Sequence, residues 1–527
     1  MINCPYSEKD KAKQLPRAKW HKKLKRWGIP KIYEAVDAAL RAWPDEELAV
    51  EDDLEEWFHK EGEHREAVWD ARHGDLFHSW PDKLRPYQKV GAEFLTMAGR
   101  AILADEMGLG KTVQALRAAV QLDDENLLVI CPNILKTHWR KEVEKWTDYE
   151  PAVVRGGPEL RANVIQEDGD VTIVNEALVR PGNDLDVLKE QDYDLVIADE
   201  AHHFKNRDAQ QTEGFHKLAN NAQHLFELTG TPIQNRVEEL WSLLHAVDPD
   251  RYSSFWRFVK KHADAHPGRF GWEIADHPTD PEALQKELQP YLLRRTNDEL
   301  KDELPEKNTR KYWVNLTGEQ QRLYDEMEEN FVAEVQDGEY VSAPAVLSQI
   351  TRLKQIAIAP ALIGGGGPSA KLKALRGIIN RDESEQFVVF SQFKKPLAMA
   401  AQLVDGATAL LTGDVAEEER ANLVDDFERG RLQVLCATIA VAGHGLDLTA
   451  ASNVIFLDKH WTPANNEQAV ARVYRSGQDE QVQVTELLAS GTIEEYIEML
   501  LDDKVNIAES ILDHIGRWAQ GEGKGAG

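Results

Sequence analysis

Two stretches of the chain alternate short apolar runs with helical segments. The first extends from residue 84 to about residue 250, and the second begins near residue 371. The apolar runs lie at 127–130, 171–174 and 195–198 in the first stretch and at 387–390, 434–436 and 454–457 in the second. Strands that alternate with helices are typical of parallel sheets covered by helices. The pattern therefore predicts an α/β protein with two lobes.

The segments outside the lobes differ from them in pattern and charge. Residues 251–310 are charged and helix-like and lack the alternation, and the glycines at 364–367 followed by Pro368 indicate a flexible joint. The predicted divisions are a basic N-terminal module at 1–43, an acidic spacer at 44–80, the first lobe at 81–250, helical insertions and an inter-lobe linker at 251–368, the second lobe at 369–505 and a tail at 506–527.

The N-terminal segment reverses its charge along its length. Residues 9–31 contain ten lysines and arginines and one acid, with Trp20 and Trp27 among them, whereas residues 44–70 contain twelve acids and two bases. Bases that alternate with tryptophan suit contacts to a nucleic-acid backbone and stacking on exposed bases. An amphipathic segment whose tryptophans pack into a small core is the alternative. The charge switch predicts a small basic module followed by an acidic spacer.

Length and charge narrow the class of protein. A chain of 527 residues is too long for one core, so about three domains are expected. The 62 lysines and arginines against 91 acids give a net charge of −29, so any DNA site must be a local basic stripe. The three cysteines are far apart and predict neither a disulfide framework nor a zinc site. No apolar run approaches a membrane span and no signal peptide is evident, so a cytoplasmic protein is expected, nucleoid-associated if prokaryotic.

Residues 104–112 form a glycine-rich loop between an apolar run and a helical stretch. A strand, a glycine loop and a helix in this order cradle phosphate groups, because the loop's amide N–H groups can turn inward. Lys111 can reach the β- and γ-phosphates of a nucleotide, and the Thr112 hydroxyl can ligate Mg²⁺. Gly108 and Gly110 allow the tight turn. The loop alone leaves an ordinary strand–helix turn open, because Asp105 stands where the strict pattern has glycine.

An acidic pair follows the apolar run that ends at residue 198. Ligands bind at the carboxyl ends of strands in parallel sheets, which is where Asp199 and Glu200 are expected. Asp199 can hold the Mg²⁺ that bridges the β- and γ-phosphates, and Glu200 can orient and deprotonate the attacking water. A helix N-terminus that carries acids is the alternative for this pair in isolation.

Two further motifs suggest how hydrolysis is sensed and completed. Thr229 and Thr231 flank a glycine before a proline, and they could hydrogen-bond the acidic motif and report the nucleotide state. Arg472 and Arg475 are three residues apart, a spacing that would place both guanidinium groups on one helix face. Such a pair suits a polyphosphate whose charge shifts during hydrolysis, although a solvated salt-bridge face would give the same spacing.

The order of these motifs resembles that of the SNF2 family of helicase-like double-stranded-DNA translocases, across roughly residues 84–505. In that resemblance Gln88 is the glutamine that contacts adenine, and residues 105–112 are the family's own form of the phosphate loop, which accounts for Asp105. Residues 292–296 resemble the stretch that links and braces the lobes. The residues that the resemblance associates with DNA contacts are Trp139, Asn175, Thr229, Ser391, Thr438 and Trp461. The chain departs from the family at Asp447, where asparagine is common.

The resemblance implies two RecA-like lobes with helical insertions between them. It also implies ATP and Mg²⁺ as cofactors and duplex DNA as the partner. Residues 12–30 resemble the HARP module of annealing helicases, which binds branched DNA and would use Trp20 and Trp27.

We therefore predict ATP hydrolysis coupled to translocation along duplex DNA, with Lys111, Asp199, Glu200, Arg472 and Arg475 as the catalytic residues. A DNA-bound protein is a further possible substrate. The alternatives are a fork-remodelling or annealing enzyme in DNA repair, a strand-separating helicase, and an ATP-gated DNA scaffold that barely turns over.

Overall fold

The computed structural model describes residues 1–2, 4, 6–43, 50–167, 169–230, 232, 236–268, 271–275, 277–336, 343–381, 384–442, 446–475 and 477–502. Thr231 of the threonine motif and the predicted tail at 506–527 lie outside these residues. The chain divides into two compact units, one of residues 1–106 and 110–296 and the other of residues 107–109 and 297–527. Among the described helices, none has both the length and the apolar character needed to cross a membrane.

The first unit is built on an all-parallel sheet. Its described strands lie in the order β11-β3-β8-β7-β4-β6-β5. The strands are β3 (Arg100–Leu103), β4 (Leu127–Cys131), β5 (Pro151–Val153), β6 (Val171–Asn175), β7 (Leu195–Asp199), β8 (His224–Leu228) and β11 (Leu292–Leu293). Because all strands are parallel, the segments that follow β3, β6, β7 and β8 emerge at one edge of the sheet, and these segments carry the predicted motifs.

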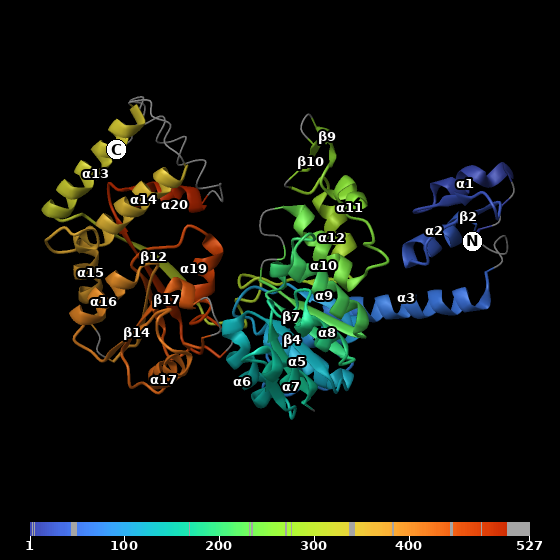
Figure 1. The fold of residues 1–527 in the computed structure, drawn as a ribbon, viewed down its shortest axis with the longest axis horizontal. Helices are drawn as coiled ribbons and strands as arrows, with labels where there is room; N and C mark the ends of the chain where they lie inside the picture. The colour runs from blue at the N-terminus through green and yellow to red at the C-terminus, as the bar shows by residue number, and fades with distance from the viewer. Residues whose placement is uncertain are drawn as a thin grey trace. The chain divides into compact units, whose positions relative to one another are not determined.

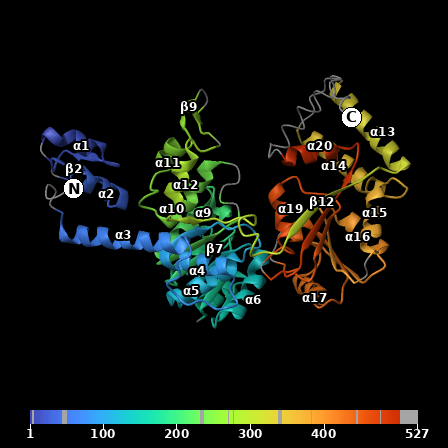
Figure 2. The same ribbon diagram turned by 180° about the vertical axis from the view of Figure 1, so that it is seen from behind.

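Helices cover both faces of this sheet (Figure 1 and, from behind, Figure 2). Successive residues of β4 enter different cores: Leu127 and Val129 pack with α4, α5 and α6, whereas Leu128 and Ile130 pack with α8, α9 and α10. The period-two alternation of a strand that is buried on both faces explains its continuous apolar run. The helices are α4 (Pro86–Ala98), α5 (Lys111–Leu122), α6 (Lys136–Trp146), α7 (Pro158–Gln166), α8 (Asn183–Lys189), α9 (Gln210–Asn221) and α10 (Leu240–Val247).

Two smaller substructures belong to the first unit. The N-terminal residues form α1 (Lys9–Gln14), the hairpin of β1 (Lys19–His21) and β2 (Arg26–Gly28), and α2 (Tyr33–Ala42), with a small core of their own, before α3 (Asp52–Arg72). The insertion after α10 comprises α11 (Phe255–His262), the antiparallel pair β9 (His266–Gly268) and β10 (Gly271–Glu273), and α12 (Pro281–Leu288).

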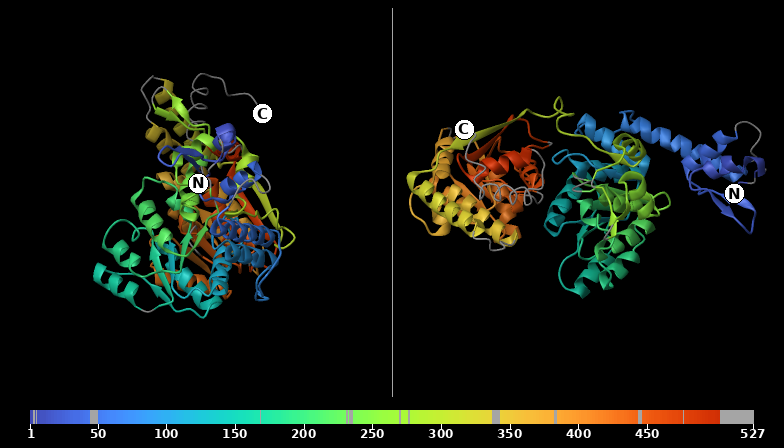
Figure 3. Two further views of the ribbon diagram at one scale, coloured as in Figure 1. Left: turned by 90° about the vertical axis from the view of Figure 1, so that its right-hand side faces the viewer. Right: turned by 90° about the horizontal axis from the view of Figure 1, so that it is seen from above.

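The second unit contains another all-parallel sheet, whose described strands lie in the order β12-β17-β16-β13-β15-β14. Helices of this unit, coloured yellow to red, surround its strands (Figure 3, right). The strands are β12 (Lys307–Val314), β13 (Phe387–Ser391), β14 (Thr408–Leu411), β15 (Val434–Thr438), β16 (Asn453–Phe456) and β17 (Val482–Ala489). The helices are α13 (Gly318–Gln336), α14 (Ala343–Ile358), α15 (Ala370–Ile379), α16 (Lys394–Leu403), α17 (Glu417–Glu428), α18 (Ile439–Ala442), α19 (Pro463–Val470) and α20 (Ile493–Asp502).

The α/β class and the two lobes are confirmed, and every apolar run used to predict them forms a strand. Cys131 and Cys436 are buried free cysteines in β4 and β15. The helical interpretation of residues 251–310 was incomplete, because β9, β10, β11 and the start of β12 lie there. The pattern did not predict β11 and β12, because β11 has only two residues and β12 is exposed at seven of its eight positions. Neither strand therefore appears in the sequence as a buried apolar run.

Candidate nucleotide-binding site

The phosphate loop lies between β3 and α5, as predicted. Gly108 and Gly110 have φ angles of +87° and +71°, in the left-handed region that favours glycine. A Cβ atom at Gly110 would also lie 2.5 Å from Nε2 of Gln88. Helix α5 begins at Lys111, so the N-terminal end of a helix, which favours anions, lies directly after the loop.

Lys111 and Gln88 both lie against this loop. The Lys111 ammonium donates to the carbonyl oxygens of Asp105 at 2.8 Å and Glu106 at 3.3 Å. Gln88 is buried in the first turn of α4, where its Oε1 accepts from the Arg85 amide at 3.1 Å while its Nε2 faces Gly110. The structure thus brings Gln88 to the loop, and its contact with adenine remains a prediction from the family resemblance.

Asp105 forms a buried ion pair that sequence reasoning missed. Its carboxylate is fully buried, and Oδ1 accepts from both the backbone N–H and Nε of Arg295, at 3.1 and 3.0 Å. Gln114 completes the cluster, because its Nε2 donates to Asp105 Oδ2 at 3.2 Å and its Oε1 accepts from Arg295 at 2.8 Å. Gly91 leaves the space for this cluster, since a Cβ there would lie 1.7 Å from Gln114 Oε1. We call Asp105, Gln114 and Arg295 the loop clamp.

Backbone pairing joins the same two segments. The amides of Ile102, Ala104 and Glu106 donate to the carbonyl oxygens of Tyr291, Leu293 and Arg295, respectively, at 2.7, 2.7 and 2.9 Å. The phosphate loop is therefore tied at its entrance to the segment that the family resemblance associates with bracing the lobes. Two features of the sequence bear on this ion pair: the aspartate at position 105, where the strict phosphate-loop pattern has glycine, and the adjacent arginines 294 and 295. No local pattern in the sequence indicates that they contact each other.

The acidic pair lies at the carboxyl end of β7. Asp199 is buried, and its two carboxylate oxygens accept from Nε1 of Trp139 at 2.8 Å and from the Glu200 amide at 3.0 Å. Burial, followed by the charge of Glu200, raises the pKa of Asp199 to about 6, while the Trp139 hydrogen bond and the Lys111 charge act to lower it. Glu200 has a φ of +51°, a conformation that non-glycine residues rarely adopt and that concentrates at functional sites.

This donor set fits a divalent cation. Mg²⁺ prefers oxygen ligands, and a buried carboxylate with a raised pKa is one whose negative charge lacks full compensation. Asp199, at the end of β7, supplies such a carboxylate, and Thr112, in the first turn of α5, supplies a hydroxyl oxygen.

Thr229 lies buried after β8 and links the motifs, as the sequence suggested. Its hydroxyl is 3.4 Å from Nδ1 of His202, which in turn lies 3.2 Å from a carboxylate oxygen of Glu200. His202 was not predicted, although it follows the acidic pair within the same motif. The three side chains form a polar connection from Thr229 to the predicted general base.

Arg472 and Arg475 lie beyond the end of a helix, which corrects one expectation. Helix α19 ends at Val470, and the turns that follow carry both arginines, so they do not share a helix face. The carbonyl oxygen of Arg472 accepts from the Leu448 amide at 2.9 Å, and the Arg475 guanidinium contacts the carboxylate of Asp447. The residue at which the chain departs from the family thus holds a predicted catalytic arginine by an ion pair.

Comparison with known proteins decides the family. Residues 87–362, more than half of the chain, match the model of the SNF2-related domain. The chain belongs to the SNF2-related family. Residues 370–477 of this SNF2-related chain match the helicase conserved C-terminal domain.

Curated relatives of this SNF2-related chain include bacterial, animal and fungal proteins. YwqA of Bacillus subtilis, which carries the name of an ATP-dependent helicase/translocase, is 30% identical over 82% of this chain and 49% of its own length. The DNA annealing helicase and endonuclease ZRANB3 of Bos taurus is 30% identical over 82% of this chain and 41% of its own length. The chain thus spans half or less of the length of these relatives. The solved SWI2/SNF2 ATPase core of Sulfolobus solfataricus in complex with dsDNA is 29% identical, with a TM-score of 0.42 over 85% of this chain and 96% of that one.

Several predicted DNA contacts of the SNF2-related chain are buried and bond to protein instead. The Trp139 side chain is fully buried against β4 and donates to Asp199, and Thr229 contacts His202. Thr438, at the end of β15, is also buried. Trp139 and Thr229 therefore take part in positioning the site, and none of the three side chains is exposed.

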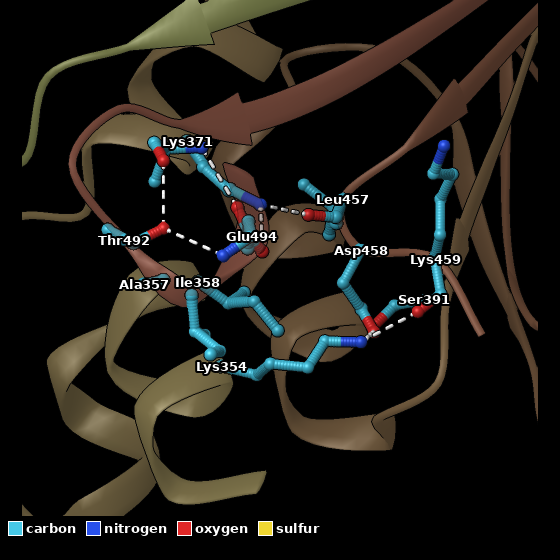
Figure 4. Close-up of polar contacts among 12 residues, drawn as sticks. Lys354, Ala357, Ile358, Lys371, Ser391, Leu457, Asp458, Lys459, Thr492 and Glu494 are labelled. Atoms are coloured by element: carbon cyan, nitrogen blue, oxygen red, sulfur yellow. Dashed lines mark hydrogen bonds and ion pairs between the residues drawn. The ribbon is translucent and has the colours of Figure 1, made fainter. Parts of the chain in front are cut away.

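Ser391 and Trp461 belong to a polar cluster of the second unit, part of which is drawn in Figure 4. The Ser391 hydroxyl contacts the carboxylate of Asp458, and the buried Lys354 ammonium donates to the Lys459 carbonyl oxygen at 2.7 Å. The same ammonium lies 4.4 Å from the ring centroid of Trp461. Burial lowers the pKa of Lys354. Trp461 is half-buried, lies in the turn before α19 and packs against the Lys354 ammonium.

A second buried pair braces the same unit. Lys371 is fully buried on α15 and donates to the Leu457 carbonyl oxygen at 2.8 Å and to the Glu494 carboxylate at 2.7 Å (Figure 4). Glu494 also accepts from the Ala489 amide at 2.8 Å. The pair therefore joins α15 to β17 and α20.

The remaining predicted DNA contacts are more accessible. Asn175 at the end of β6 donates to Asn133 at 3.1 Å and accepts from two amides of the following turn. Trp20 and Trp27 pair across the β1–β2 hairpin with ring centroids 5.6 Å apart, and Trp20 is 48% exposed. Trp20 is thus available to a ligand, while Trp27 packs partly on the small N-terminal core.

Proposed function

We propose that this chain is an ATPase that translocates along double-stranded DNA. The observation that supports the proposal most strongly is the acidic pair of β7 beside a phosphate loop, with the Lys111 charge acting directly on Asp199. In the SNF2-related family this combination suits hydrolysis of the terminal phosphate of ATP. The names of the relatives, a helicase/translocase and a DNA annealing helicase, support DNA as the partner.

Each site residue has a proposed task in hydrolysis. The loop amides and Lys111 bind the β- and γ-phosphates, and Thr112 with Asp199 holds Mg²⁺, which supplies positive charge to the phosphate oxygens. Glu200 orients the attacking water and accepts its proton. Trp139 keeps Asp199 in place and favours its ionised form, since the hydrogen bond lowers the pKa of that carboxyl. Arg472 and Arg475 stabilise the charge that develops during transfer.

The test is the steady-state ATPase rate without DNA and with duplex, single-stranded or forked DNA, beside a Lys111→Ala control. Strong stimulation by duplex that disappears in the control supports the translocase. Stimulation by single strands alone would support a strand-separating helicase instead. Slow turnover with ATP-dependent DNA retention would support a scaffold, and no DNA effect at any salt concentration would overturn the proposal.

Asp447 offers a separate test of the second-lobe arginines. Asp447→Asn removes the carboxylate that pairs with Arg475 and keeps the side-chain volume. If Arg475 contacts ATP phosphates, the variant should lower the KM for ATP, because the guanidinium no longer leaves an ion pair in order to bind. Arg475→Ala should abolish most activity, and an unchanged rate in that variant would remove Arg475 from the mechanism.

Fork remodelling is the second candidate, and the β1–β2 hairpin favours it. The hairpin exposes Trp20, and the residues between its strands are Lys22, Lys23, Leu24 and Lys25. Trp20→Ala should reduce the preference for forked over duplex DNA and leave duplex stimulation intact. Trp69→Ala removes a tryptophan of similar exposure, 47%, from α3 and serves as the matched control. If Trp20→Ala and Trp69→Ala have the same preference for forked over duplex DNA, the hairpin is excluded as the site that recognises the fork.

A further inference from the structure

The insertion of the first unit exposes a pair of tryptophans beside cations. Trp256 on α11 and Trp272 on β10 are 38% and 44% exposed, and their ring centroids lie 4.7 Å apart at an interplanar angle of 38°. The Lys260 ammonium lies 4.7 Å from the Trp272 ring centroid. The Arg207 guanidinium lies 3.7 Å from the ring of Phe255 and 5.7 Å from that of Trp256. We call these five side chains the Trp256–Trp272 surface.

Packing of the insertion does not require the outer two rings. Phe255 is the anchor, since it packs partly on the core of the first unit and lies edge-on to Trp241 at 5.6 Å. Phe258 and Val259 bury the opposite side of α11. Trp256 and Trp272 stay outside that core, where large apolar rings gain little from folding.

The local charge is opposite to that of the whole chain. Helix α11 contains Arg257, Lys260 and Lys261 and no acidic residue, in a protein whose net charge is −29. Lys261 forms an ion pair with Glu287 of α12, which leaves Arg257 and Lys260 as the other cations of the helix. The acids nearest to the surface in the chain are Asp208, 3.5 Å from Arg207, and Glu273 beside Trp272. Cations that alternate with exposed aromatic rings attract a polyanion and offer its bases a stacking face.

We propose that the Trp256–Trp272 surface binds single-stranded DNA, with bases stacked on the two tryptophans and phosphates contacted by Lys260 and Arg207. The binding is tolerant of sequence, because every base has an aromatic face. This goes beyond the proposed translocation on duplex DNA, because it adds a separate site for an unpaired strand.

The test is titration of the full-length chain with a fluorescent oligothymidylate at two salt concentrations. Trp256→Ala and Trp272→Ala should each weaken binding about tenfold, and the double variant more, as expected for loss of stacking on each ring. Trp256→Phe and Trp272→Phe should keep most of the affinity, because phenylalanine still stacks. Lys260→Gln should lower the salt dependence by about one phosphate contact. Duplex-stimulated ATPase should be unchanged in all of them, which separates this proposal from the translocase itself.

Trp69→Ala, at an exposed tryptophan of α3, is the matched control and should bind oligothymidylate like the parent chain. Thermal melting checks that each variant is folded. Unchanged affinity for oligothymidylate in a folded Trp256→Ala/Trp272→Ala double variant would overturn the proposal. A protein partner would then be the alternative occupant of this surface. Equal weakening in Trp69→Ala would overturn the proposal as well.

Discussion

Replacing Asp105 by glycine should damage this protein, even though glycine is what the strict phosphate-loop pattern has at that position. The loop clamp is the reason. In Asp105→Gly the Arg295 guanidinium, whose side chain is only 13% exposed, loses the carboxylate that compensates its charge. The backbone amide of Arg295 also loses its acceptor.

The expected cost is about 3–5 kcal/mol, the range for removing one partner of a buried ion pair. Glycine adds roughly 0.5–1 kcal/mol from the extra freedom of the unfolded chain. Asp105→Asn should cost less than Asp105→Gly, because an amide oxygen can still accept a hydrogen bond. Combining Asp105→Asn with Arg295→Met should recover part of the loss, since no unpaired charge remains buried.

Hydrogen exchange is the assay, because it reports on local opening in a chain with two units. The amides of Ile102, Ala104 and Glu106 bond to the segment that ends at Arg295, so their exchange should become about 10²–10⁴ times faster in Asp105→Gly. Arg322→Ala, which breaks an exposed pair with Glu319 in the second unit, is the control and should leave these amides unchanged. Protection within about tenfold of the parent would refute a structural role for the clamp.

Three further predictions concern other buried groups. Trp139→Phe removes a hydrogen bond that lowers the pKa of Asp199, so that pKa should rise above about 6. Calorimetric titrations between pH 5 and pH 8 should show that, as the pH falls, the variant loses Mg²⁺–nucleotide binding at a higher pH than the parent. Burial lowers the pKa of His216 from its ordinary value of 6.5 to about 4. Between these two pH values the unfolded chain binds a proton at this histidine and the folded chain does not. The free energy of unfolding should therefore fall by about 3 kcal/mol as the pH falls from 6.5 to 4. His216→Gln should flatten that dependence in thermal melts. Lys371→Met should lower the free energy of unfolding of the second unit, measured in urea, by about 3–5 kcal/mol, because it leaves the buried Glu494 carboxylate without its cation. A Lys371→Met/Glu494→Gln double variant that is no more stable than Lys371→Met would contradict this.

The nucleotide site was predictable from sequence to the extent that its parts are contiguous. The phosphate loop and the acidic pair each follow a strand that is buried on both faces, and such strands appear as apolar runs. Their residue types also suggest the proposed chemistry directly: glycines for the turn, a lysine for phosphate, and carboxylates for metal and water. The place of Gln88 beside the loop came from the family resemblance instead.

Contacts between distant residues could not be predicted in the same way. Asp105 and Arg295 are separated by 190 positions, and β11, which delivers Arg295, is an edge strand of two residues. The burial of Trp139 likewise depends on α6 packing across the sheet, so a residue expected to contact DNA instead bonds to Asp199.

The sequence by itself determined the α/β class, the two lobes and the identity of the loop and acidic motifs, because these follow from local periodicity and from residue chemistry. Tertiary structure alone decided which charges are buried together, where α19 ends before Arg472, and which tryptophans stay exposed. Those outcomes depend on packing between elements far apart in the chain. That packing buries the charges of Asp105 and Arg295 together and leaves Trp256 and Trp272 exposed.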